Sequence, residues 1–238
     1  MNTDFGGDME HPKEGIASVG ADGGAAERLR TVRGVGVAAS VLVLLVVAYD
    51  VLHTVSDWRV YLVVEDILAG NATVADVQSV DDFAGYFDGL QGLAVLVPAG
   101  VVFLIWLWRA RLNAEALGGP GSQRRARGWV VGSWMTPVAN LWIPYRVVAD
   151  VWEASAPRRT APGPLLTVWW VAWVVGGMVN RAYTYQVMKD AASEDDLRRV
   201  VYLGTVGVAL DVLAGVLIVH TVHRISVWQT QRLAGAGR

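Results

Sequence analysis

Residues 128–152 read GWVVGSWMTPVANLWIPYRVVADVW, and this stretch decides how the rest of the chain is interpreted. It is apolar enough to enter a membrane, but Pro137 and Pro144 interrupt it and Asn140 lies between them. Proline removes a backbone hydrogen bond and breaks a helix. Broken backbone at membrane depth is tolerated where it is buried in protein or lines a cavity. The stretch therefore predicts a broken segment instead of an ordinary spanning helix.

The composition is that of a polytopic membrane protein. Of the 238 residues, 53% are hydrophobic and only 18% are charged, whereas soluble domains carry about 25% charged residues. Cysteine is absent, which excludes disulfides, thiolate metal sites, iron–sulfur clusters and a cysteine nucleophile. The net charge of −2 gives no indication of a nucleic-acid partner.

Four further apolar runs are long enough to cross a hydrocarbon core of about 30 Å. Arginines precede the first run, which continues past Tyr49 without a cleavage signal, so we expect an uncleaved anchor. The predicted fold is an all-α polytopic membrane bundle of four transmembrane helices plus a Pro-broken segment that is re-entrant, interfacial or a fifth crossing. The predicted domains are a disordered cytoplasmic tail at 1–33, a membrane helical domain at 34–228 and a short cytoplasmic tail at 229–238. The four runs are residues 34–55, 90–108, 165–181 and 200–222.

The distribution of lysine and arginine favours four crossings over five. Cytoplasmic loops of membrane proteins are enriched in these residues. With four crossings, all but five of the 20 basic residues lie on the cytoplasmic side, whereas a fifth crossing moves two more to the outside. We therefore predict a multi-pass protein of the cell membrane with both termini in the cytoplasm. The five outer residues are Arg59, Arg181, Lys189, Arg198 and Arg199.

The outer loop between the first two runs, residues 56–89, is rich in aspartate and glutamate. Thr73 is placed to cap a short helix within this loop that continues through Phe87. We expect that helix to lie on the outer membrane surface or to fold over the bundle. The apolar residues that follow one side of it are Val74, Val77, Val80, Phe83 and Phe87.

Motifs in and around the broken segment resemble those of one known family. They are WLWRARLNAEAL at 106–117, the run at 128–155 and PLLTVWWVAWVV at 164–175. Together they are similar to the family catalogued as domain of unknown function 4328, which are multi-spanning membrane proteins of high-GC Gram-positive bacteria. The resemblance extends over roughly residues 35–230 and implies an architecture without an established activity. The marks of the family fall on Arg109, Arg111, Asn113, Ser133, Trp134, Pro137, Asn140, Leu141 and Pro144.

The candidate binding residues are the polar, aromatic and proline residues of these motifs and a carboxylate in the last apolar run, Asp211. An unpaired carboxylate at bilayer depth costs roughly 2.5–3.5 kcal/mol on insertion scales. Asp211 therefore either binds a proton or an ion, or forms a structural bond to Asn140, Arg146 or Asn180 that holds the last helix against the broken segment. We favour the structural bond. The predicted binding residues are Arg109, Arg111, Asn113, Trp134, Pro137, Asn140, Trp142, Pro144 and Asp211.

Arginines gather on both sides of the linker that precedes the broken segment. They predict an anionic lipid site at Arg124, Arg125 and Arg127, or they only set the topology, and the two roles are compatible.

The tryptophans divide into two groups. Those at the ends of apolar runs predict interfacial belts, namely Trp58, Trp106, Trp108, Trp129, Trp152 and Trp228. The others predict a packed aromatic wall around the break, and they are Trp134, Trp142, Trp169, Trp170 and Trp173.

Two pairs of residues have a spacing that places them on one helix face: Asp50 with His53, and His220 with His223. The pairs lie toward opposite membrane surfaces, and neither supplies the three or four ligands that zinc requires. We interpret them as residues of helix ends, and we predict neither a metal nor another cofactor.

Three functions are compatible with these features. The leading hypothesis is a non-enzymatic membrane protein that presents the broken segment to a lipid, to a partner protein or to a second copy of the chain. A conduit for a small solute or for protons that uses Asp211 is the alternative. A lipid-active intramembrane enzyme that uses Asp50, His53 or Asp211 is weaker, because the sequence shows neither a nucleophile–base motif nor a phosphate loop.

Overall fold

A computed structural model describes residues 30–86, 91–119, 121–158, 160–189 and 193–236, and the elements formed by these residues are all helical. Most of the predicted tail at 1–33 lies outside the described residues. The elements are α2 (Arg33–Leu68), α3 (Val74–Gly85), α4 (Gln91–Gly118), α5 (Trp129–Met135), η1 (Ala139–Leu141), α6 (Ile143–Ser155), α7 (Pro164–Val187) and α8 (Glu194–Ala236).

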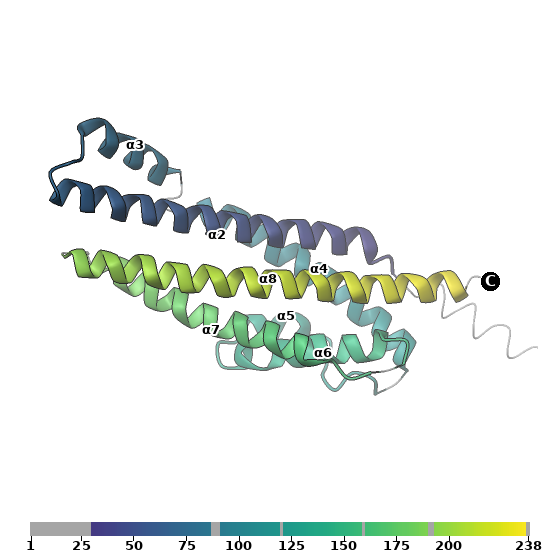
Figure 1. The fold of residues 1–238 in the computed structure, drawn as a ribbon. Coiled ribbons are helices and arrows are strands. Elements are labelled where there is room, and N and C mark those ends of the chain that lie inside the picture. The colour runs from purple at the N-terminus through teal and green to yellow at the C-terminus, as the bar shows by residue number, and fades with distance from the viewer. Residues whose placement is uncertain (1–29, 87–90, 120, 159, 190–192, 237–238) are drawn as a thin grey trace, which may run out of the picture.

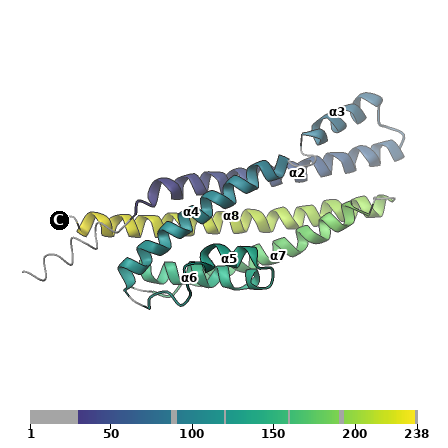
Figure 2. The same ribbon diagram turned by 180° about the vertical axis from the view of Figure 1, so that it is seen from behind.

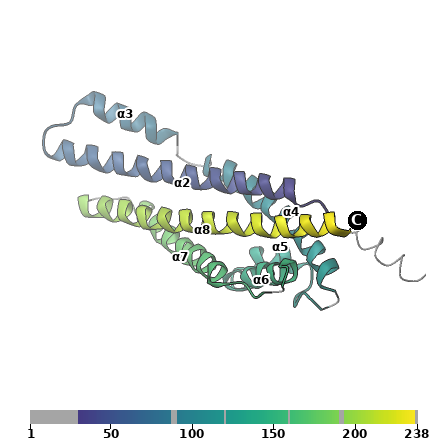
Figure 3. The same ribbon diagram turned by 45° about the vertical axis from the view of Figure 1, so that its right-hand side comes forward.

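Four helices, α2, α4, α7 and α8, are long and apolar enough to cross a membrane. The predicted fold class, a polytopic helical membrane bundle with four spans, is therefore confirmed. α8 packs along both α2 and α7, and α4 packs against α2 and crosses behind α8 toward α6 in the view of Figure 1, as Figure 2 shows from the other face. We call the end of the bundle at which α2 begins and α8 ends the terminal end, and the opposite end the α3 end (Figure 3).

The helices extend well beyond the apolar runs. α2 continues to Leu68, so residues 56–68 are helical where a loop was predicted, and α8 continues to Ala236 through most of the predicted tail at 229–238. Polar residues in these extensions find partners on other helices. Tyr183 Oη donates a hydrogen bond to Asp57 at 2.9 Å. The length of an apolar run therefore measures the hydrocarbon core and underestimates the helix.

Thr73 begins α3, as predicted. Its hydroxyl accepts a hydrogen bond from the Asp76 N–H at 3.3 Å, and the Asp76 carboxylate accepts one from the Thr73 N–H at 2.9 Å. Hydrogen bonds from Thr73, first from its side chain and then from its backbone, lower the pKa of Asp76. α3 folds over α2, where the Arg59 guanidinium lies 4.8 Å from the centre of the Phe83 ring. Phe87, the predicted last residue, lies outside the described part of the chain.

The broken segment folds into a helical hairpin made of α5, η1 and α6. α5 ends where Thr136 adopts an extended conformation (φ −97°, ψ 111°) before Pro137, and Pro144 occupies the first turn of α6. Proline is tolerated there because the first N–H groups of a helix have no intrahelical partner. The predicted break is thus confirmed, and it is caused by the two prolines within the segment itself.

The hairpin enters and leaves the bundle on the same side. Arg124, just before α5, forms ion pairs with Asp150 at 3.5 Å and with Glu153 at 3.2 Å, near the end of α6. At the tip, the Trp134 ring lies 5.7 Å from the ring of Phe103. That level is roughly 12 Å along α4 from Arg111, at 1.5 Å per residue. The broken segment therefore turns back on itself and does not run from one end of the bundle to the other, so it is not a fifth full-length helix.

The apolar core lies where the hairpin packs against α4, α7 and α8. The sequence predicts Trp106 in an interfacial belt, but Trp106 is fully buried in this core. Its indole N–H donates a hydrogen bond to Ser226 Oγ at 3.0 Å and so is satisfied inside the protein. Four of the five predicted wall tryptophans do form a cluster, whereas Trp142 is 44% exposed. The cluster consists of Trp134, Trp169, Trp170 and Trp173, with ring centres 5.0–6.2 Å apart.

Candidate functional site

A large cleft opens beside the tip of the hairpin. Its volume is about 1470 Å³, and its walls come from α2, α4, α7, α8 and the tip. Most of the lining side chains are aliphatic or aromatic. Ligand pockets in proteins typically measure about 300–1,000 Å³ and are mainly apolar with a few polar groups. The cleft is therefore large enough for an amphipathic molecule of the size of a lipid.

Two residues of the hairpin tip that line this cleft also carry buried polar atoms without a hydrogen-bond partner. Trp134 and Asn140 both line it, and the indole Nε1 and the amide Oδ1 are buried without a hydrogen-bond partner in the described protein. Ser133 Oγ, beside them in the chain, is in the same state. A buried polar group without a partner costs about 1–3 kcal/mol. Both residues therefore carry hydrogen-bonding capacity that the described protein leaves unused.

Asp211 also lines the cleft, but its partner is on α7. Its carboxylate accepts a hydrogen bond from Asn180 Nδ2 at 2.9 Å. Of the three predicted partners, Asn180 is correct. The prediction that this bond holds α8 against the hairpin is wrong, because Asn180 belongs to α7, which packs along α8.

Asp50 and His53 face the same cleft as Asp211. Their spacing predicts that they share one face of α2, but it does not predict that this face and Asp211 of α8 line the same cleft. His53 Nδ1 lies 3.6 Å from Asp57 Oδ2. Among the residues that the structure describes, there is no group of three His, Cys, Asp or Glu side chains arranged to hold a metal ion.

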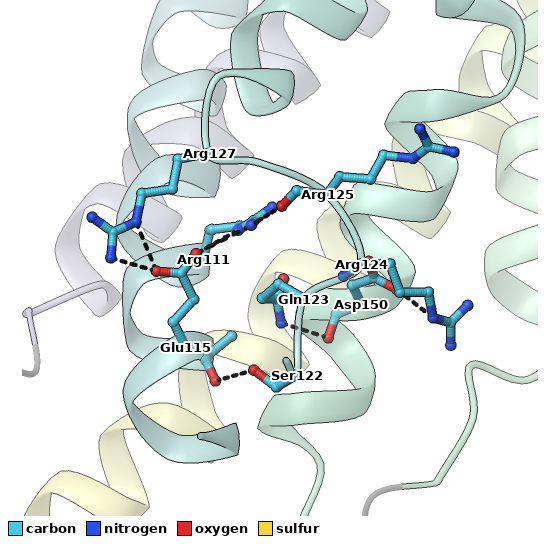
Figure 4. A network of polar contacts seen from close by, with 9 residues as sticks. Arg111, Glu115, Ser122, Gln123, Arg124, Arg125, Arg127 and Asp150 are labelled. Carbon is cyan, nitrogen blue, oxygen red and sulfur yellow. Dashed lines mark hydrogen bonds and ion pairs between the residues drawn. The ribbon is translucent and has the colours of Figure 1, made fainter. Parts of the chain in front are cut away.

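The base of the hairpin carries a separate ionic cluster (Figure 4). Arg111 is 2% exposed, and its Nη2 lies 3.1 Å from Glu115 Oε1 and donates to the carbonyl oxygen of Arg125. Arg127 Nη2 lies 2.7 Å from the other oxygen of Glu115. The hydrogen bond and the charge of Glu115 raise the pKa of Arg127. Arg111 Nη1 is buried and has no partner within the described protein.

Asp150 ties the linker before α5 to α6. Its carboxylate accepts a hydrogen bond from the Arg124 N–H at 3.1 Å, and its carbonyl oxygen accepts one from Gln123 Nε2 at 3.2 Å. Burial raises the pKa of Asp150, and the hydrogen bond and charge of Arg124 act in the opposite direction. Arg124 is thus committed to closing the base of the hairpin.

Asn113 is the centre of a buried polar network. Its Oδ1 accepts a hydrogen bond from the Arg30 N–H at 2.7 Å, and its Nδ2 donates to Gln229 Oε1 at 3.0 Å. Gln229 is fully buried, and its Nε2 donates to Ser155 Oγ at 2.7 Å and to the Ala110 carbonyl at 2.9 Å. The network joins the chain before α2 to α4, α6 and α8, and it leaves no group of Asn113 free to bind a ligand.

Sequence reasoning missed Gln229 because it was placed in the C-terminal tail. A signal was present: Val222, Ile225 and Gln229 are spaced at i, i+3 and i+7, which continues the buried face of α8 beyond the apolar run.

The predicted binding residues thus separate into three groups. Trp134, Pro137, Asn140 and Asp211 meet around the cleft. Arg111 lies at the base of the hairpin. The remaining four do not line either cavity: Arg109 donates to the Thr31 carbonyl at 3.4 Å, Asn113 belongs to the buried network, Trp142 is exposed and Pro144 is buried in the first turn of α6.

Comparison with known proteins identifies the chain by family. Neither a curated protein nor a solved structure matches it. A family model described as domain of unknown function (DUF4328) matches residues 69–227, most of the chain, from the end of α2 to α8 and including the hairpin. The four helices long enough to span a membrane and the helical hairpin are therefore the structure of a member of the DUF4328 family, to which this protein belongs.

Proposed function

We propose that this protein is a non-enzymatic membrane protein that binds a membrane lipid in the cleft through the tip of its hairpin. The observation that carries the proposal is the pair of buried, unpaired polar atoms at the tip, Trp134 Nε1 and Asn140 Oδ1. The first is a donor and the second an acceptor. Ester and hydroxyl groups of a lipid supply both complements, while the apolar walls suit its acyl chains.

Two features favour a lipid over other ligands. The cleft lies among four helices that are apolar enough to span a membrane, so lipid is the molecule at high concentration around it. The side chains that the tip contributes include Trp134, Pro137 and Asn140, which are not nucleophiles or general bases in the usual enzymatic mechanisms. Binding is therefore the role that we propose for these tip residues.

Substitutions at the tip are expected to reduce lipid retention. Asn140→Leu and Trp134→Phe each remove one hydrogen-bonding group, and a net hydrogen bond contributes about 0.5–1.5 kcal/mol, which corresponds to about a 2- to 10-fold loss of affinity. The measurement is the amount of each lipid per protein that survives purification in mild detergent, by native mass spectrometry.

The matched controls are Asn71→Leu and Trp142→Phe, which change the same residue types at exposed positions outside the cleft. Equal lipid retention in tip variants and controls contradicts the proposal. Reproducible copurification of a protein in place of lipid, lost with Asn140→Leu, assigns the tip to a partner protein.

We further propose that the terminal end faces the cytoplasm and that the membrane is the cell membrane. Exposed arginines at the base of the hairpin support this orientation. Since the chain has no natural cysteine, single cysteines at Arg124 and Asp195 report sidedness, and both positions are more than two thirds exposed. An impermeant maleimide is expected to label Asp195→Cys in intact cells and Arg124→Cys only after lysis. The reverse pattern overturns the orientation.

A second candidate function is a proton or small-solute conduit. The observation that favours it is that Asp50 of α2 and Asp211 of α8 line the same cleft. Ionisable groups inside a membrane protein often mark ion pathways. If the protein conducts protons, liposomes that contain it dissipate a pH gradient and those with Asp211→Asn do so several-fold more slowly. Wild-type liposomes that hold the gradient like empty ones eliminate this candidate.

A further inference from the structure

A second pocket, separate from the cleft, opens at the base of the hairpin. It has a volume of about 390 Å³ and is formed by the end of α4 and the linker to α5 (Figure 4). This size is within the usual range for small-ligand sites. Among the described residues that line it, Glu115 is the one carboxylate, whereas Arg111, Arg125 and Arg127 are cationic. The pocket therefore has an excess of positive charge that favours an anion.

Two lining residues contribute buried polar atoms without a partner in the described protein, Arg111 Nη1 and Gln123 Oε1. The first requires an acceptor and the second a donor. A guanidinium buried in this way is costly unless its donors are used. An anionic oxygen supplies the first requirement, and a hydroxyl group supplies the second.

The arginines at this pocket differ in their availability. Arg124 is committed to Asp150 and Glu153, and Figure 4 shows the Arg125 side chain directed away from Arg111 and Glu115. The Arg127 side chain is 61% exposed. Within the ionic cluster, its ion-pair partner is Glu115. Exposed ion pairs stabilise a protein weakly, so Arg127 is able to leave Glu115 for a ligand.

We infer that this pocket binds a phosphate ester whose alcohol carries a free hydroxyl group, with the phosphate on Arg111 and Arg127 and the hydroxyl on Gln123. Arginine suits phosphate because its planar donors match two phosphate oxygens. Both a soluble polyol phosphate and the headgroup of an anionic lipid have this chemistry. The sequence predicts an anionic-lipid site at Arg124, Arg125 and Arg127. The proposed site instead has Arg111 and Arg127 at its centre.

The experiment measures binding to the full-length protein in detergent by titration calorimetry. Three probes separate the sources: glycerol 3-phosphate, dihexanoyl phosphatidylglycerol and dihexanoyl phosphatidylcholine. We expect Arg127→Gln to weaken both phosphoglycerol probes about 10-fold, because one charge-assisted contact is lost. Gln123→Leu is expected to weaken the phosphoglycerol probes and to leave the phosphocholine probe unchanged.

Glu115→Gln distinguishes a ligand site from a structural cluster. It retains the shape of the side chain but removes the carboxylate that competes with a ligand for both guanidinium groups. We expect it to strengthen phosphoglycerol binding about 3-fold or more. Arg158→Gln is the matched control, since Arg158 is an exposed arginine of another loop that does not line the pocket, and it is expected to change nothing.

Binding of glycerol 3-phosphate as tight as that of phosphatidylglycerol assigns the site to a soluble ligand, and binding of the lipid alone assigns it to a headgroup. The inference is overturned if wild-type protein binds neither phosphoglycerol probe, or if Arg158→Gln weakens binding as much as Arg127→Gln. Weaker binding by a folded Glu115→Gln variant also overturns it. If that variant does not fold, the comparison of Arg127→Gln with Arg158→Gln decides. Asn140 lines the cleft and not this pocket. The lipid proposal for the cleft is therefore tested independently of the inference for this pocket.

Discussion

Gln229→Leu is expected to lower the free energy of unfolding by about 2–6 kcal/mol, because it leaves Ser155 Oγ and one side-chain N–H of Asn113 without partners at about 1–3 kcal/mol each. Gln229 is fully buried and donates to Ser155 Oγ and to the Ala110 carbonyl, while it accepts from Asn113. Leucine has a similar volume, so the loss comes from unpaired polar atoms and not from a cavity. Unfolding in detergent by an SDS titration, followed by tryptophan fluorescence, measures the change.

The control for this prediction lies two residues further along α8. Gln231 is exposed, so Gln231→Leu makes the same chemical change without breaking a buried contact. It is expected to alter stability by no more than about 0.5 kcal/mol. If both variants unfold at the same SDS concentration, the buried network does not stabilise the bundle, and the terminal end is held by apolar packing alone.

Gly36→Val is expected to destabilise the protein by about 2–4 kcal/mol, from overpacking and from the loss of one hydrogen bond. A Cβ atom at Gly36 lies 2.7 Å from Ser226 Oγ and 3.2 Å from Trp106 Nε1, which are closer than ordinary contacts. Those two atoms form the buried bond that joins α4 to α8. The substitution therefore pushes α2 away from both helices, and the same SDS titration detects it.

Gly34→Val provides the comparison, because a Cβ atom at Gly34 has no neighbour within 4 Å. Since valine also has a higher helix propensity than glycine, this variant is expected to be neutral or slightly stabilised. Equal destabilisation by the two substitutions would contradict the packing explanation, because a Cβ atom at Gly34 meets no neighbour and valine is the better helix former.

The parts of the fold that the sequence predicts correctly are those set by local chemistry. Apolar runs of about 20 residues identify the four spans, and Thr73 with Asp76 identifies the start of α3. The break between α5 and α6 follows from Pro137 and Pro144. Each of these signals depends on one continuous stretch of the chain, so no knowledge of the tertiary structure is needed to interpret them.

The candidate site was predicted in composition but not in arrangement. Trp134, Pro137 and Asn140 do meet at one place, because they lie within seven residues of the same hairpin tip. Whether Asp50 lines the cleft, and whether Asp211 pairs with Asn180, depends on how α2, α7 and α8 are rotated about their axes. Helices that are apolar on nearly all sides carry little information about that rotation.

The sequence by itself therefore determined the class, the number of spans and the position of the break, because hydrophobic length and missing proline N–H groups act locally. Only the tertiary structure decided that the broken segment turns back, that its tip forms a wall of a cleft and that its base closes a second pocket. The physical reason is that these features come from contacts between distant residues, such as Gln229 with Ser155 and Arg124 with Asp150. Such pairs form when helices pack, and a single sequence does not specify which polar side chains will meet.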